Sequence, residues 1–300
     1  MSMIQSWLQS LDYSFEILPN CTKAISPLST CNICVSVCTD DAIQLKNNIP
    51  VIDTNKCTEC TKCLVECPVQ AIAGILPARK VKEDKLFLND SHVPTVKELL
   101  IYYKKNVKTI VLTEEKEEFI TIIHLTNEYL REMNLEPFTL LDSYVEEEEK
   151  YSRADLFQLF KKESKQLIKE VTPAKWRFNH EHVKMNNLFK EYEFYSISLN
   201  QDKCILCNAC EKLCPDKCFT ITDNAFIISA QACQGCNLCV DVCREDALQI
   251  TKQIRITEEK SIPIIKTRCN SCRKHFLSMD QTTTTCYVCT KKQQYSGYLI

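Results

Sequence analysis

Glycine is nearly absent from this chain of 300 residues, which contains only Gly74, Gly235 and Gly297. The phosphate-binding loop G-x-x-x-x-G-K-[ST] and the dinucleotide-binding turn G-x-G-x-x-G both require closely spaced glycines. The sequence therefore gives no indication of ATP, NAD or FAD bound by either device.

Long apolar runs are also missing. No stretch of about 18 uncharged apolar residues, the length needed to span a bilayer, occurs in the chain. The segment 1–20 has no basic region followed by an apolar run, which is the pattern of a secretory leader. We therefore expect no membrane span and no export, and a cytoplasmic location.

Cysteine, in contrast, is abundant, with 21 residues in three blocks, 21–67, 204–243 and 269–289. A chain of this length does not need disulfides to compensate for a small core. Cysteine-rich sequences inside the cell bind metals or carry redox groups more often than they form disulfide frameworks. The cysteines therefore predict metal chemistry.

The middle block contains the motif Cys204-x2-Cys207-x2-Cys210-x3-Cys214-Pro215, and the motif recurs from Cys233 without the proline. Three cysteines two residues apart bind three irons of one cube, and the fourth reaches the other cube. The pattern over residues 200–251 resembles bacterial dicluster ferredoxins. The resemblance implies that one 4Fe–4S cluster takes Cys204, Cys207, Cys210 and Cys243, and that the other takes Cys233, Cys236, Cys239 and Cys214. Cys218 is left over and is interpreted as a small buried apolar residue.

The first block resembles the same module but has one defect. Its complete motif supplies Cys57, Cys60 and Cys63, which the resemblance groups with Cys38. The second cluster has Cys31, Cys34 and Cys67, because Leu28 stands where the first cysteine belongs.

Cys21 lies ten residues before Cys31, and a loop between them could bring it to the open position. A three-iron cluster, a non-protein ligand and a reactive site are the alternatives. The sequence thus predicts three to four 4Fe–4S clusters in all.

The third block consists of two C-x2-C pairs, and such pairs are typical of a closed tetrahedral zinc site. Its cysteines are Cys269, Cys272, Cys286 and Cys289. A single iron, as in rubredoxin, is the alternative, but rubredoxin pairs usually carry proline and glycine, which these lack. We therefore expect one zinc ion in a zinc-ribbon-like tail.

Between the first two blocks, strand and helix patterns alternate. Residues 85–88, 108–112 and 138–141 read as strands, and residues 94–106 and 115–133 read as amphipathic helices. This order predicts a small parallel α/β unit. A further helix is expected from Ser152 to just before Pro173.

The expected fold class is α+β, in five parts. An N-terminal helix and the first ferredoxin module occupy 1–80, the α/β insertion 81–145, a helical linker 146–195, the second module 196–255, and the zinc-ribbon-like tail 256–300.

The expected function is electron transfer. The formal charge of −2 becomes on the order of −10 when four clusters are bound, which argues against a nucleic-acid partner. We expect an iron–sulfur carrier, or an electron-transfer subunit of a larger oxidoreductase such as a formate dehydrogenase or hydrogenase, with redox proteins as partners and no catalytic site of its own. The alternative is a redox-sensing or assembly protein that uses the irregular cluster and the zinc ribbon.

Overall fold

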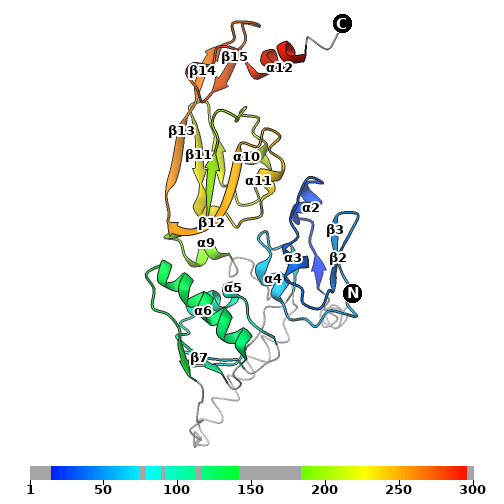
Figure 1. The fold of residues 1–300 in the computed structure, drawn as a ribbon, viewed down its shortest axis with the longest axis vertical. Coiled ribbons are helices and arrows are strands. Elements are labelled where there is room, and N and C mark those ends of the chain that lie inside the picture. Colours follow the sequence, from blue (N-terminus) through cyan, green and yellow to red (C-terminus); the bar gives the residue numbers. More distant parts are fainter. Residues whose placement is uncertain (1–14, 75–78, 89–91, 113–115, 142–183, 296–300) are drawn as a thin grey trace, which may run out of the picture. The chain divides into compact units, whose positions relative to one another are not determined.

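The computed structural model describes residues 15–74, 79–88, 92–112, 116–141 and 184–295 (Figure 1). The chain divides into two compact units, the first made of residues 1–21 and 32–188 and the second of residues 22–31 and 189–300. The expected N-terminal helix and the helix from Ser152 toward Pro173 lie outside the described residues. Within the described ranges, helix and strand are mixed, in agreement with the α+β class.

The first unit begins with short elements that carry cysteines between them. Strand β1 (Glu16–Ile17) pairs antiparallel with β4 (Ile72–Ala73), and β2 (Ile43–Lys46) pairs antiparallel with β3 (Ile49–Ile52). Asn47 and Asn48, between β2 and β3, have φ values of 51° and 63°. Two left-handed residues make the tight turn whose twist matches a hairpin.

Two one-turn helices belong to this part of the first unit. They are α3 (Ile33–Ser36) and α4 (Lys62–Glu66). The apolar side chains of Leu64 and Val65 are buried on α4. The helix therefore anchors the cysteine loop that precedes it to the core.

The second half of the first unit is an α/β layer structure. Its sheet has the order β5-β6-β7-β8, and the last three strands are parallel. The elements are β5 (Val81–Lys82), β6 (Lys85–Leu88), α5 (Val96–Lys104), β7 (Thr109–Leu112), α6 (Glu117–Glu132) and β8 (Thr139–Leu141). Only β5, an antiparallel edge strand, adds to the alternation that the sequence pattern predicts.

The helices of this layer follow their amphipathic patterns. The side-chain oxygen of Thr95 accepts a hydrogen bond from the Glu98 backbone N–H, which caps the start of α5. Leu99 on α5 and Ile123 on α6 are fully buried. Arg79 pairs with the buried carboxylate of Glu98 at 2.6 Å, so this charge is compensated inside the layer. A one-turn helix, α9 (Met185–Leu188), ends the described part of the unit.

In the second unit, two sheets and two short helices surround the cysteines of the middle block. Strand β9 (Tyr192–Leu199) pairs with β12 (Leu248–Ile256). The other sheet has the order β10-β11-β13, with β10 (Phe219–Ile221), β11 (Ala225–Ser229) and β13 (Glu259–Pro263). The helices are α10 (Ala209–Leu213) and α11 (Leu238–Asp241), and η2 (Ala230–Ala232) is a 3-10 turn. Helix α2 (Thr22–Ile25) lies in the separate segment of this unit.

The end of the chain forms a small hairpin and a helix. Strand β14 (Ile265–Arg268) pairs with β15 (His275–Ser278), and α12 (Tyr287–Tyr295) follows (Figure 1). These three elements carry the four cysteines of the third block on or beside them.

Two of the expected boundaries divide strands that the structure keeps together. The boundary after residue 195 cuts β9, and the boundary after residue 255 cuts β12. In addition, β13 pairs with β11 over five residues, from Ala225↔Pro263 to Ser229↔Glu259. Residues 256–263 therefore belong to the sheet of the second module, because backbone hydrogen bonds join them to it, and the tail begins after them.

Among the described residues, none of the helices combines the length and the apolar character that crossing a bilayer requires.

Candidate metal centres

One group of thiols in the second unit gathers around a pocket. The pocket is lined by the four cysteines Cys204, Cys207, Cys210 and Cys243. Burial raises the pKa of Cys204, and the nearby thiols of Cys207 and Cys243 raise it further. Cys243, the last cysteine of the second motif, thus lies beside the first three cysteines of the first motif. The ferredoxin resemblance implies this exchange of the fourth cysteine between the two motifs.

A second group lies in the same unit. Burial raises the pKa of Cys236 to about 12, and the thiols of Cys214 and Cys233 contribute in the same direction. Burial also raises the pKa of Cys239, with Cys233, Cys236 and Cys214 adding to the shift. The structure therefore brings Cys214 to Cys233, Cys236 and Cys239, which completes the second expected set.

Buried, mutually repelling thiols fit a metal cluster. At neutral pH, thiols with raised pKa values stay protonated unless a cation replaces the proton. Iron bound here would replace the protons and offset the repulsion between the resulting thiolates. The donor set, four cysteine sulfurs at each position, matches the ligation of a 4Fe–4S cluster.

The backbone of each loop explains how three cysteines point to one place. After the first cysteine of the motif, the second and fourth residues have left-handed φ values in all three complete motifs. These residues are Glu59 (57°) and Thr61 (64°), Leu206 (53°) and Asn208 (61°), and Gly235 (73°) and Asn237 (58°). Two left-handed residues curl the chain, so that successive thiols face a common centre.

Gly235 is required for a further reason. A Cβ atom built at this position would lie 2.3 Å from the ring of Tyr195. Since no side chain fits there and φ is positive, glycine is the only residue that meets both conditions.

The fourth cysteine of each motif has its own recurring geometry. Three residues after it, a left-handed residue turns the chain, namely Asp41, Gln70, Lys217 or Asp246. The next backbone N–H then donates to the sulfur, at 3.3 Å to Cys38, 3.1 Å to Cys67, 3.3 Å to Cys214 and 3.3 Å to Cys243. Hydrogen bonds to a thiolate stabilise its charge. All four repeats, including the defective one, therefore hold this cysteine in the same way.

Cys218 occupies the position that alanine holds in the other three repeats. It is buried, as expected, and its thiol also forms hydrogen bonds with two cluster-motif thiols. Hydrogen bonds with the thiols of Cys214 and Cys233 raise the pKa of Cys218, and the bond from Cys218 lowers the pKa of Cys214 to about 7. This contact was not foreseen from the sequence, although the alanine at the equivalent positions was a signal that the site is tight.

In the first unit, a small pocket is lined by Cys38, Cys57, Cys60 and Cys63. Burial raises the pKa of Cys63 to about 12, with the thiols of Cys60, Cys57, Cys34 and Cys38 adding to the shift. The four ligands expected for the regular cluster of the first module thus surround one space.

The irregular site differs in its backbone. Leu28 stands at the first-cysteine position and is 54% exposed. Neither Thr30 nor Asn32, which correspond to the two left-handed residues of the complete motifs, has a positive φ. Cys21 and Cys67 are buried. The boundary between the two units passes between Cys31 and Asn32, so the grouping of Cys31, Cys34, Cys67 and Cys21 stays a prediction.

Among the described residues, the four tail cysteines lie close enough together to hold a single metal ion. The sulfurs of Cys269, Cys272, Cys286 and Cys289 all lie within 4.8 Å of one another. A tetrahedral zinc ion with Zn–S bonds of about 2.3 Å holds its sulfurs about 3.8 Å apart. The Cys272 and Cys286 sulfurs are 3.8 Å apart, so the group has the size of such a site.

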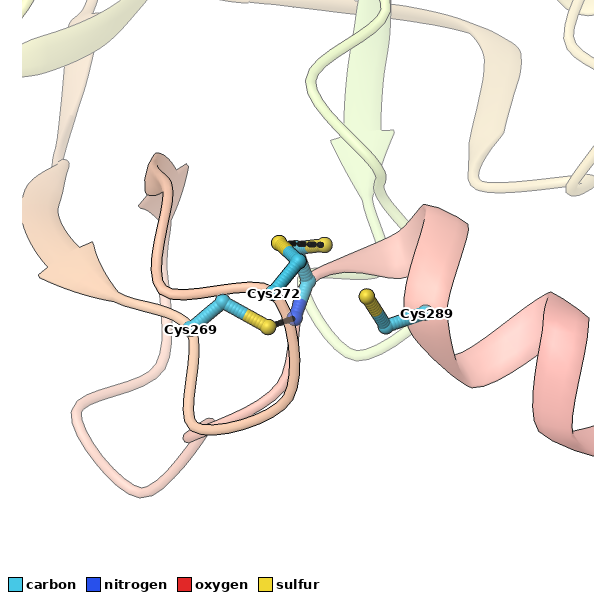
Figure 2. Close-up of side chains that lie close together, drawn as sticks. Cys269, Cys272 and Cys289 are labelled. Carbon is cyan, nitrogen blue, oxygen red and sulfur yellow. Dashed lines mark hydrogen bonds between the residues drawn. The ribbon is translucent and has the colours of Figure 1, made fainter.

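Backbone amides prepare one of these thiols for a metal. The backbone N–H of Cys286 donates a hydrogen bond of 3.3 Å to the Cys269 sulfur, and Figure 2 shows a dashed line at this sulfur. The amides of Cys272 and Cys286 lower the pKa of Cys269 to about 6. A thiol with this pKa is a thiolate at neutral pH, which is the form that binds metal.

Comparison with known proteins bears on the two ferredoxin modules. Residues 49–72 and residues 197–220 each match a 4Fe–4S binding domain. A segment of 39 residues, 13% of the chain, is 44% identical to an uncharacterized ferredoxin of Methanocaldococcus jannaschii and covers 26% of that protein. The chain therefore spans about a quarter of the relative that it matches. No solved structure matches the chain.

The matched ranges coincide with regions where the structure gathers thiols. Residues 49–72 include β3 and α4 with Cys57, Cys60 and Cys63. Residues 197–220 include α10 and the motif cysteines Cys204, Cys207, Cys210 and Cys214. These matches confirm the ferredoxin resemblance read from the cysteine motifs: the chain contains two 4Fe–4S binding domains of the ferredoxin type.

Proposed function

We propose that this protein passes electrons to or from a larger oxidoreductase of the formate dehydrogenase or hydrogenase type, as a separate carrier or as a subunit. The observation that carries the proposal is the exchange of Cys214 and Cys243 between the two thiol groups of the second unit. The exchange ties two cluster positions into one module, so an electron that arrives at one position can pass to the other within that module.

A bound 4Fe–4S cluster supplies one-electron chemistry, and this chain supplies its surroundings. The backbone N–H donors to the fourth cysteine of each motif stabilise the added negative charge. Burial of Cys233 and Cys239, 7% and 5% exposed, shields one position from water, whereas Cys207 is exposed at the other. The exposed position is the natural point of electron exchange with a partner, because transfer is fastest across short distances.

We further propose that the isolated chain has no catalytic site of its own. In support of this, the pockets described in the two units are lined by the cysteines of the cluster positions themselves. The protein then holds three to four clusters, the number depending on the irregular site, and one zinc ion in the tail. Zinc is favoured by the closed four-thiolate group, and a single iron is the alternative.

The test uses the full chain, reconstituted anaerobically with iron and sulfide. A formate dehydrogenase with formate, or a hydrogenase with hydrogen, is mixed with the oxidised protein, and bleaching of the visible absorbance is followed. We expect rapid bleaching with at least one of the two enzymes, and slower bleaching with Cys207→Ser. A protein that holds its iron but accepts electrons from neither enzyme would contradict the proposed partner class.

A second candidate function, redox sensing or assembly, is favoured by one observation. The loop at Leu28 lacks both left-handed residues that the complete motifs share, and a different ligand set or solvent access changes the potential of a cluster. One measurement distinguishes the two functions. If exposure to air removes a single cluster, if iron, sulfide and reductant restore it, and if the other clusters stay intact throughout, the result supports the sensor.

A further inference from the structure

The metal group of the tail lies next to one of the cluster positions. Helix α12 begins at Tyr287, between the cysteines Cys286 and Cys289. The Tyr287 hydroxyl donates a hydrogen bond of 2.9 Å to Oε1 of Glu245. Glu245 follows Cys243 by two residues, so the contact joins the tail to a loop that supplies a cluster thiol.

Tyr287 also forms part of the wall of the pocket around Cys204, Cys207, Cys210 and Cys243. Apart from these cysteines, the lining is mostly apolar and includes Leu199, Ile221 and Val242. The aromatic ring is the only part of the lining that comes from the tail among the residues described for this pocket. It therefore covers a side of the pocket that the ferredoxin module itself leaves open.

The two cluster positions of this unit differ in the solvent exposure of their cysteines. Cys233 and Cys239 are buried by their own module, whereas Cys207 is exposed. Water and small reagents reach a cluster from its exposed side. A cover at the Cys207 position therefore changes solvent access, while one at the other position would change little.

A metal held by the tail cysteines would keep the start of α12, and with it the cover, in place. Helix α12 spans only nine residues, and helices of this length are marginal in water without outside support. Two of the four metal thiolates lie directly before and within its first turn. Since metal binding supplies folding free energy to small thiolate sites, loss of the metal releases the start of the helix and the side chain of Tyr287 with it.

We propose that the four-cysteine metal site of the tail governs solvent access to the cluster at Cys204, Cys207, Cys210 and Cys243, with Tyr287 as the positioning residue that couples the two. The inference rests on the proposed function in requiring that this cluster and the tail metal are both bound. Glu245 fixes the cover through its hydrogen bond, and the tail metal fixes the helix that carries it.

Residue-resolved cluster loss tests the inference. The reconstituted full chain is exposed anaerobically to an iron chelator together with iodoacetamide, and alkylated cysteines are followed by peptide mass spectrometry. In Tyr287→Ala we expect alkylation of Cys204, Cys207 and Cys210 to become several-fold faster. Alkylation of Cys233, Cys236 and Cys239 in the same samples should keep the wild-type rate, which provides an internal control.

Three further variants make the test specific. Val288→Ala changes the next residue of α12, which is 59% exposed and does not line the pocket, and should behave as wild type. Tyr287→Phe removes only the hydroxyl, so a smaller increase is expected. Glu245→Gln keeps an acceptor for that hydroxyl and should stay close to wild type.

The link to the metal is tested with Cys272→Ser, which removes a tail ligand. This variant should lose the tail metal and show the same acceleration as Tyr287→Ala. The two changes combined should give no further increase, because they act through one element. The midpoint potential of the exposed cluster should also rise in both variants, since water stabilises the more negative reduced state.

Two results overturn the inference. The first is alkylation of Cys204, Cys207 and Cys210 at the wild-type rate in Tyr287→Ala, and the second is loss of the tail metal without any acceleration. Absence of iron from the wild-type chain overturns the proposed function as well, whereas a normal iron content with unchanged rates overturns the inference alone.

Discussion

Left-handed residues are the signature of the cluster loops at the scale of single residues. In the three complete motifs they stand at the same two positions after the first cysteine, and a further one precedes each N–H···S hydrogen bond. Most of them are not glycine, so each carries a small conformational cost that the closed loop must offset. A cluster bound by the three thiols of the loop would offset this cost, because its bonds to those thiols would hold the loop together.

Gly235 is the loop residue least able to change. Gly235→Ala places a Cβ atom 2.3 Å from the Tyr195 ring, so we expect loss of about four irons, those of the cluster at Cys233, Cys236 and Cys239. Iron analysis after anaerobic reconstitution measures this loss.

Two further variants decide the cause. Asn237→Ala, at a position with a similar φ of 58°, should keep its iron. Tyr195→Leu should rescue Gly235→Ala, since it removes the ring. Equal iron loss in Asn237→Ala would mean that backbone conformation, not the ring, makes glycine necessary.

Cys21 is the residue on which the irregular cluster depends. If it supplies the missing thiolate, Cys21→Ser should cost about one iron or produce a three-iron EPR signal, with the other clusters unchanged. We do not expect Leu28→Cys to repair this variant, because Leu28 is 54% exposed and the loop after it lacks the left-handed residues. Unchanged iron and EPR in Cys21→Ser would exclude Cys21 as a ligand.

At the scale of elements, β13 decides where the second module ends. It pairs with β11 along its whole length, and the next residue, Ile264, is buried and donates from its backbone N–H to the carbonyl oxygen of Asn224 at 2.8 Å. The ferredoxin sheet thus incorporates residues that follow the last cluster cysteine, Cys243, by many positions. The tail that remains after Ile264 is a hairpin, a four-cysteine group and one helix.

Two truncations should therefore behave differently. A stop after Ile264 removes the tail metal and keeps the sheet, so the iron content should stay the same. A stop after Thr251 also removes β13 and half of β12, so we expect unstable clusters in the second module. Iron and zinc analysis of both proteins measures this, and equal iron retention would show that β13 is dispensable.

For the whole molecule, metal content matters more than the formal charge of −2. Four clusters bring about 16 irons, and a three-iron or absent irregular cluster brings somewhat fewer. We expect this number, with about one zinc, in the reconstituted full chain. Iron, sulfide and zinc analysis against protein concentration measures it, and a value of about eight irons or fewer would mean that one of the two modules does not bind clusters.

The sequence by itself determined the chemistry. Cysteine spacing is a covalent property of the chain, and it specified the two 4Fe–4S binding domains and the four-thiolate tail group before any fold was known. The strand and helix order of the insertion was also readable, because Leu99, Ile110 and Ile123 follow the periods of their elements.

Tertiary structure decided what depends on residues that are distant in sequence. Strands β11 and β13 pair although the second cysteine motif lies between them in the sequence. The short polar segment 256–263 has no residue pattern that predicts this pairing. The hydrogen bond of Tyr287 to Glu245, the thiol contacts of Cys218 and the clash that makes Gly235 necessary all join elements through folding. The spacing of the cysteines along the chain indicates the ligands. Only the packed fold determines which cluster position is open to water and which side chain covers it.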